Sequence, residues 1–193
     1  GWADYYGNED FFKAYPNDDR KEWNYMTEWK IKSGEIIPYT ESADKLPAIS
    51  KYYDYDEGAP GKSAQSNGIT CIYRYAEVLL MYAEASTRAT NSVNQDALNA
   101  IQEVQKRAGY QDRQIELTTT TEPTAFLAAV SNERGWEFFA EMKRWFELVR
   151  LEKVKEVRAE EWDASTFNTN HHYYFPVPYQ QVDLAGWTNN AGY

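Results

Sequence analysis

The sequence is poor in residues that form covalent or metal-bound cross-links. Its single cysteine, Cys71, excludes an internal disulfide, and we expect the thiol to be packed rather than reactive. The histidines, His171 and His172, are adjacent and would point in opposite directions in an extended segment. One zinc ion could not readily use both, so we expect no metal site. Without a serine or cysteine nucleophile arrangement or a glycine-rich phosphate loop, we also expect no cofactor.

Positive charge and long apolar runs are scarce as well. Lysine and arginine number 20 against 30 aspartates and glutamates, which gives a net charge of -10 at pH 7. Nucleic-acid binding requires basic patches, so this balance argues against that partner and is compatible with uncharged ligands such as sugars. The sequence shows no signal peptide, lipobox or transmembrane run, which says nothing about a longer protein.

Aromatic side chains are in excess. Seven tryptophans and 16 tyrosines are more than a helical core needs, and many lie in loop-like sequence before residue 60. Sugar rings stack their flat C–H faces on aromatic rings, while polar neighbours bond the hydroxyls. The predicted ligand-binding residues, with the first three as first choices, are Trp2, Tyr5, Tyr6, Trp23, Tyr25, Trp29 and Tyr55. The alternative, that such a residue packs beneath the loops, stays open for each of them.

The distribution of apolar residues predicts helices in the second part of the chain. Residues 71–109 read as a helical hairpin joined at 90–93, with Asn94 as N-cap and Gly109 just past the end. Within it, positions 75, 78, 79 and 82 predict a core-facing stripe. A long helical region should follow over 123–158, bent near 141–143.

The remaining segments lack helical periodicity. Residues 1–70 should be loop-rich, with short extended pieces at 25–31, 36–39 and 51–55, and residues 159–193 mostly irregular. Residues 54–58 faintly resemble a calcium loop, but Gln65 stands where the bidentate glutamate belongs, so we interpret them as a solvated turn.

Charged residues recur at helical spacing inside apolar segments. Arg74 with Glu77, and Glu84 with Arg88, are close enough on a helix to pair. We interpret a larger set as structural ion pairs that hold helices in register, comprising Arg74, Glu77, Glu133, Arg134, Glu137, Glu141 and Arg144. A glycosidase would instead use two of the carboxylates as acid and base across a cleft. The sequence shows no such pair.

Four blocks identify a family resemblance by their order. They are residues 74–85, 97–109, 133–150 and 175–184, followed by the closing segment 189–193. Together they resemble the C-terminal region of the SusD/RagB family over about residues 9 to 193, and 17–21 resembles an acidic–basic turn of that family. Met142 stands where the family often has glycine, so the backbone there need not take a left-handed turn. Glu147, Gln181 and Ala191 are further departures.

The resemblance implies a mainly α fold, a SusD-like, tetratricopeptide-like helical scaffold with long irregular loops. This chain would be its C-terminal portion, since Gly1 would begin in mid-protein and Tyr193 would fall where family chains end. Residues 1–70 would form a loop-rich, ligand-facing part, and residues 71–193 the helical core with its closing loop.

The resemblance also implies a function. Family members are surface-exposed outer-membrane lipoproteins that capture glycans or oligosaccharides without catalysis and deliver them to a SusC-like TonB-dependent transporter. Membrane contact would come only through a lipidated N-terminal part absent from this sequence. Capture of peptides, as in RagB-type members, is the alternative, and a glycoside hydrolase is a less favoured one.

Overall fold

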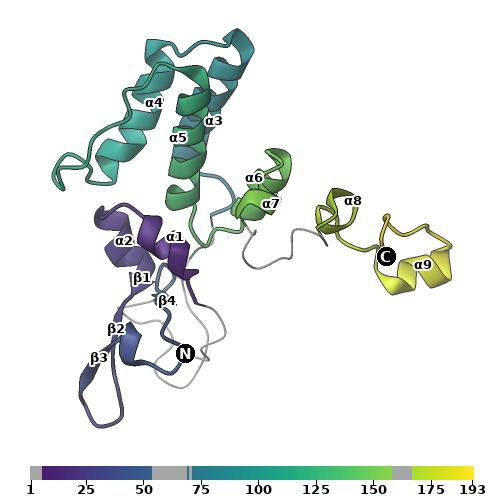
Figure 1. Ribbon diagram of the computed structural model, residues 1–193, viewed down its shortest axis with the longest axis horizontal. Coiled ribbons are helices and arrows are strands. Elements are labelled where there is room, and N and C mark those ends of the chain that lie inside the picture. The colour runs from purple at the N-terminus through teal and green to yellow at the C-terminus, as the bar shows by residue number, and fades with distance from the viewer. Residues whose placement is uncertain (1–5, 54–68, 70, 158–166) are drawn as a thin grey trace. The chain divides into compact units, whose positions relative to one another are not determined.

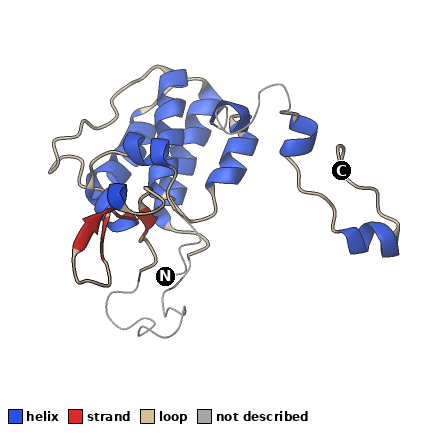
Figure 2. Ribbon diagram, turned by 60° about the horizontal axis from the view of Figure 1, so that its bottom comes forward, coloured by secondary structure: helices blue, strands red, loops and turns tan. Residues whose placement is uncertain are grey.

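The computed structural model describes residues 6–53, 69, 71–157 and 167–193, without the side chains of 169 and 170. It divides into two compact units, Gly1–Met142 and Lys143–Tyr193, which are described separately. Helices dominate both units, so the predicted mainly α fold is confirmed (Figure 2).

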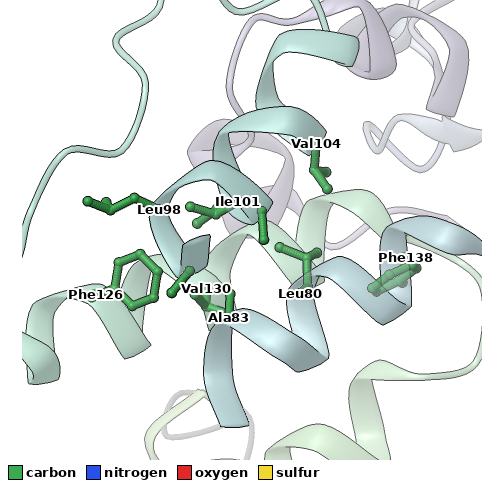
Figure 3. Packing of buried hydrophobic residues seen from close by; sticks show 10 residues of the cluster. Leu80, Ala83, Leu98, Ile101, Val104, Phe126, Val130 and Phe138 are labelled. Atoms are coloured by element: carbon green, nitrogen blue, oxygen red, sulfur yellow. The ribbon is translucent and has the colours of Figure 1, made fainter. Parts of the chain in front are cut away.

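Helices α3 (Tyr75–Thr90), α4 (Gln95–Arg107) and α5 (Pro123–Glu137) form the core of the first unit (Figure 1). Figure 3 shows their buried side chains meeting between the helices. The cluster comprises Leu80, Ala83, Ala97, Leu98, Ala100, Ile101, Val104, Phe126, Val130 and Phe138. Burying a large aliphatic side chain such as Leu80 or Ile101 stabilises the fold by about 1.5–3 kcal/mol, so this cluster supplies much of the unit's cohesion.

The predicted helical hairpin is confirmed by α3 and α4. The side chain of Asn94 accepts a hydrogen bond from Ala97 N at 2.8 Å and so caps α4. Gly109, just past the end of α4, has a φ of +82°, a conformation that glycine adopts without steric cost.

The apolar stripe predicted to face the core from α3 is wrong for this chain. Tyr75, Val78 and Tyr82 are exposed, and Leu79 is half-buried. The buried side of α3 instead comprises Glu77, Leu80, Ala83, Glu84 and Thr87. Two carboxylates therefore point inward, and this rotates the helix relative to the orientation that hydrophobicity alone predicts.

Two short helices precede residue 70, where none was predicted. They are α1 (Glu9–Ala14) and α2 (Asp19–Asn24). Asn8 and Asp18 cap them through side-chain bonds to Phe11 N and Lys21 N. These caps, each followed by acidic residues in the first turn, were the signal in the sequence that could have predicted the two helices. A helix of six residues is too short to show an apolar periodicity.

Short antiparallel strands make up the rest of this region. β1 (Tyr25–Met26) pairs with β4 (Ala48–Ile49), and β2 (Glu28–Lys30) pairs with β3 (Ile36–Pro38), which leads into the 3-10 helix η1 (Tyr39–Glu41). The extended pieces predicted at 25–31 and 36–39 are confirmed. The piece predicted at 51–55 is wrong for residues 51–53, the part that the structure describes, because 51–52 form a turn and 53 belongs to no strand.

The helical region after Pro123 is interrupted rather than bent. Beyond α5 the chain makes turns in which Ala140 and Met142 both have a φ of +58°. Met142 therefore does take a left-handed conformation, although a methionine does not require one. The left-handed turn that a glycine would favour at this position forms here with a methionine, whose side chain makes that backbone conformation sterically costly.

The second unit contains α6 (Arg144–Arg150), α7 (Val154–Val157), α8 (Thr169–His172) and α9 (Tyr179–Ala185). The last two were not predicted. Because His171 and His172 lie in α8, their rings stack at 4.6 Å between centroids instead of pointing apart. Pro178 precedes α9 as its N-cap, and residues 175–178 belong to no helix, strand or turn.

Cys71 lies at the surface, so the expectation of a packed thiol is also wrong. It belongs to the exposed segment 71–73 that leads into α3. None of the helices in the described part of the chain is long and apolar enough to cross a membrane.

Candidate functional site

The carboxylate of Glu137, at the end of α5, lies at the centre of a buried ion-pair network in the first unit. It accepts hydrogen bonds from Arg20 Nη1 at 2.7 Å, Arg107 Nη2 at 2.5 Å and Arg74 Nη1. The Glu137 side chain is 1% exposed. These arginines come from α2, from the end of α4 and from the residue before α3, so one carboxylate ties four segments together.

Glu133 lies one turn earlier on α5 and is fully buried. Its Oε1 accepts from Arg20 Nη1 at 2.7 Å, while Oε2 accepts from Gln105 Nε2 at 3.2 Å and Tyr110 Oη at 3.1 Å. Burial raises the pKa of this carboxyl group, and the Arg20 guanidinium opposes that rise. Arg20 also bonds Asp18, at 2.5 Å.

Glu141, in the turns after α5, binds two cations. Lys51 Nζ lies 2.5 Å and Arg74 Nη2 2.8 Å from its Oε1. Burial alone would raise the pKa of Glu141, but the hydrogen bonds from Arg74 and Lys51 outweigh it and hold the pKa below its ordinary value. The turn that carries Glu141 is thereby fixed to the segments before α3 and after β4.

The predicted ion-pair residues are only partly arranged as their spacing suggested. Arg74 contacts Glu137 and Glu141 rather than Glu77, which instead lies 3.7 Å from Arg134 Nη2. In the second unit, Arg144 bonds Glu147 at 3.1 Å. Sequence reasoning missed the roles of Arg20, Asp18, Lys51, Arg107, Gln105 and Tyr110.

An aromatic interior lies beside the network. Tyr25 is 3% exposed, and its ring packs against Phe12, Tyr15 and Phe139 at centroid distances of 4.9, 5.7 and 4.5 Å. Tyr25 therefore fits the alternative reading, in which a loop aromatic forms part of a satellite core. Tyr15 is equally buried, and its hydroxyl donates to Trp136 O at 2.6 Å.

Other aromatic residues face solvent near one end of the β1–β4 pair. Trp23 is 65% exposed, Tyr52 44% and Tyr53 56%. Their backbone segments are adjacent, since Ser50 Oγ donates to Trp23 O at 2.7 Å and Tyr53 N donates to Ser50 O at 2.8 Å. We call Trp23, Tyr52 and Tyr53 the aromatic surface.

The other predicted ligand-binding residues either lie apart from the aromatic surface or fall outside the residues that the structure describes. Trp29, in β2, is half-buried. Tyr6 is half-buried too, and its hydroxyl donates to Asp44 at 2.6 Å. Trp2, Tyr5 and Tyr55, like the calcium-like segment 54–58, lie outside the described residues.

An open depression of about 340 Å³ lies between α1, α2, β1 and the segment after α4. It is lined by Phe12, Asn17, Asp18, Lys21, Glu22, Tyr25, Thr27 and Arg113. Aromatic and charged groups meet in it, which is the combination that polar ring-shaped ligands require. No group of three or more histidine, cysteine or acidic side chains suited to a metal ion occurs within the described ranges.

Comparisons with known proteins agree with the helical fold. The SusD family model matches residues 1–193. SusD-like protein P2 from Formosa agariphila is 28% identical over 200 residues, covering 94% of this chain and 39% of the relative.

Solved structures show the same likeness. A SusD superfamily protein from Parabacteroides distasonis superposes with a TM-score of 0.77 at 24% identity, over 97% of this chain and 42% of that one. The surface glycan-binding protein A from Bacteroides uniformis gives a TM-score of 0.64 at 24% identity, over 95% and 40% of the two chains. The chain thus spans about two fifths of the length of these relatives. Since the family model matches from the first residue to the last, the chain belongs to the SusD family.

Proposed function

We propose that this chain is part of a non-catalytic, surface-exposed outer-membrane protein that captures glycans or oligosaccharides and delivers them to a SusC-like TonB-dependent transporter. Membership of the SusD family supports the proposal, as does the likeness to a protein described as surface glycan-binding. The observation that carries it within this chain is the aromatic surface, where Trp23 and Tyr53 are both more than half exposed.

Exposed rings at this position are suited to stacking on sugars. The part of an aromatic ring that stays in water gains nothing from burial, whereas a sugar ring laid on it removes that apolar surface from water. Within this surface, Tyr52 Oη donates to Ala140 O at 3.2 Å, and the preceding residue, Lys51, forms an ion pair with Glu141. The ion-pair network therefore fixes the backbone that presents the rings, which limits the entropy lost on binding.

The acidic residues support capture rather than hydrolysis. A glycosidase needs a carboxyl group that stays protonated near neutral pH and that reaches the substrate. Glu141 is held below its ordinary pKa by Arg74 and Lys51. Burial raises the pKa of Glu133, but that side chain is 0% exposed and its oxygens are bonded within the protein.

The proposal is tested first with a glycan array and then by calorimetry with the best oligosaccharide from it. Trp23→Ala and Tyr53→Ala should each weaken binding by roughly 1–3 kcal/mol, the range known for stacking of a ring on an aromatic side chain. Tyr75→Ala is the matched control, because Tyr75 is 66% exposed but belongs to α3 and not to the aromatic surface.

The same titrations show which aromatic residues bind the oligosaccharide and whether it is cleaved. Trp2→Ala and Tyr5→Ala examine the predicted residues that lie outside the described part. Equal affinities for the Trp23, Tyr53 and Tyr75 variants would remove the aromatic surface from the site. Release of new reducing ends from the bound oligosaccharide would overturn the non-catalytic assignment.

A further inference from the structure

The depression described above differs from the aromatic surface in its charge. Its volume of about 340 Å³ is near the lower end of the range of small-molecule sites, roughly 300–1,000 Å³. It is therefore suited to a single sugar ring rather than to a long chain. Phe12 and Tyr25 supply apolar wall, and Asn17 and Thr27 supply polar groups.

The other charged groups of its lining already have ion-pair partners. Asp18 bonds Arg20 at 2.5 Å, and Glu22 bonds Arg113 Nη1 at 2.8 Å. Arg113 also bonds Asp19, at 2.9 Å. These contacts leave Lys21 as the lining residue whose charge is not matched by an ion pair within the described residues.

Lys21 has room for an anionic partner. Its ammonium group donates to Tyr15 O at 3.0 Å and to Asn17 Oδ1 at 3.2 Å, both of them neutral oxygens, and so has one of its three protons left over. The ammonium lies 4.5 Å from the centroid of the Phe12 ring. Burial lowers the pKa of Lys21, and the nearby Asp18 opposes this only in part. A partly buried cation of this kind gains somewhat more from a carboxylate than a fully exposed lysine does.

We propose that this depression binds a hexuronate, a sugar ring whose carboxylate pairs with the Lys21 ammonium. The choice of a sugar rests on the proposed function, whereas the preference for a carboxylate rests on Lys21 alone. The site is separate from the aromatic surface, so a glycan that carries uronate units could engage both.

The test uses the 193-residue chain and a matched pair of ligands, methyl β-D-glucuronide and methyl β-D-glucoside, which differ in the carboxylate. In NMR titrations we expect the glucuronide to bind about tenfold more tightly or better, as a charge-assisted hydrogen bond allows. The shifts should centre on the amides of Asn17 and Thr27. Raising the salt concentration should reduce the preference.

Lys21→Met should abolish the preference for the glucuronide, and Lys21→Arg should retain most of it. Lys13→Met is the control, since Lys13 is an exposed lysine on the neighbouring helix α1 and pairs with Glu9 at 2.9 Å. If Lys21→Met did not fold, the salt dependence of the wild-type chain and the Lys21→Arg titration would still show whether a cation at position 21 causes the preference for the glucuronide.

Three results would overturn the inference. They are equal affinity for the two glycosides, a preference that survives in Lys21→Met, and binding of plain acetate as tight as that of the glucuronide, which would mark a site for any anion. A failure of the proposed function can be told apart from a failure of this inference. It would appear as unchanged affinity of Trp23→Ala and Tyr53→Ala for the oligosaccharide selected on the array.

Discussion

Arg20 and Glu133 are 113 positions apart in the sequence, yet Arg20 Nη1 donates to Glu133 Oε1 at 2.7 Å in the interior of the first unit. The Arg20 side chain is 9% exposed and that of Glu133 0%. This contact joins α2 to α5, and the other bonds of Arg20, to Asp18 and Glu137, place it between three carboxylates. Ion pairs thus join the two helices.

Replacing Arg20 by alanine should destabilise the chain strongly. The carboxylates of Asp18 and Glu133 would stay buried without their cation, and breaking such a pair costs about 3–5 kcal/mol. Urea denaturation followed by circular dichroism should show the loss as a lower midpoint with little change in slope.

Lys13→Ala is the control for this prediction. It removes an ion pair with Glu9 whose side chains are 62% and 48% exposed, and it should leave the midpoint nearly unchanged. Equal shifts for Arg20→Ala and Lys13→Ala would contradict the role of the network.

Glu141 should contribute stability that depends on pH. Its pKa in the folded chain lies below the ordinary value of 4.5, because the bonds from Arg74 and Lys51 outweigh burial. A depressed folded pKa gives stability that is fully present above the unfolded value and is lost as the pH falls through the folded value.

The comparison of wild type with Glu141→Gln isolates this effect, because the opposite contribution of Glu133 is common to both chains. The difference in melting temperature should be largest above about pH 5 and should shrink as the pH falls below 4.5. A difference that stayed constant from pH 7 to pH 3 would exclude the charge of Glu141 as its source.

Removing the hydroxyl group from two buried tyrosines should change the stability of the chain in opposite directions. Tyr25→Phe removes a buried hydroxyl without a partner in the described structure and should stabilise the chain by about 1 kcal/mol. Tyr110→Phe removes a donor to Glu133 Oε2 and should destabilise it by about 1–3 kcal/mol. Both are measured by denaturation without ligand, and a loss of stability in Tyr25→Phe would reveal a partner for that hydroxyl.

The helical hairpin could be predicted because local signals determine it. An N-cap at Asn94 and a glycine at 109 mark the ends of α4, and the apolar positions between them lie on one face. The orientation of α3 could not be predicted in this way. Its exposed stripe has the apolar pattern of a core, whereas its buried side includes two glutamates. Glu84 pairs with Arg88 on the same helix, as its spacing predicted, but Glu77 lies 3.7 Å from Arg134 on α5, a partner that no local pattern reveals.

The ion-pair network shows the same limit. The spacing of Glu133, Glu137 and Glu141 indicated that they act together, because residues four apart share a helix face. Their partners Arg20 and Lys51 are 113 and 90 positions away from the acids they bind, beyond the reach of any local pattern. Whether a loop aromatic was exposed, like Trp23, or buried, like Tyr25, also depended on packing that composition does not reveal.

Met142 gives a final prediction, because its backbone contradicts its residue type. It has a φ of +58°, and its side chain is exposed, the residue as a whole being 82% accessible. A left-handed conformation costs an L-residue roughly 1–2 kcal/mol, which exceeds the roughly 0.5–1 kcal/mol of chain entropy that a glycine adds to the unfolded state. Met142→Gly should therefore raise the stability of the chain by up to about 1 kcal/mol.

The matched control is Asn91→Gly. Asn91 has a φ of +47° at the end of α3, but asparagine tolerates this conformation, so the gain should be smaller. Differential scanning calorimetry of the two variants measures both effects. If Met142→Gly lowered the melting temperature, the methionine side chain would have to make a stabilising contact that outweighs its backbone strain. If it raised the melting temperature more than Asn91→Gly did, the strain at Met142 would be the cost of the turn that brings Glu141 to Arg74 and Lys51.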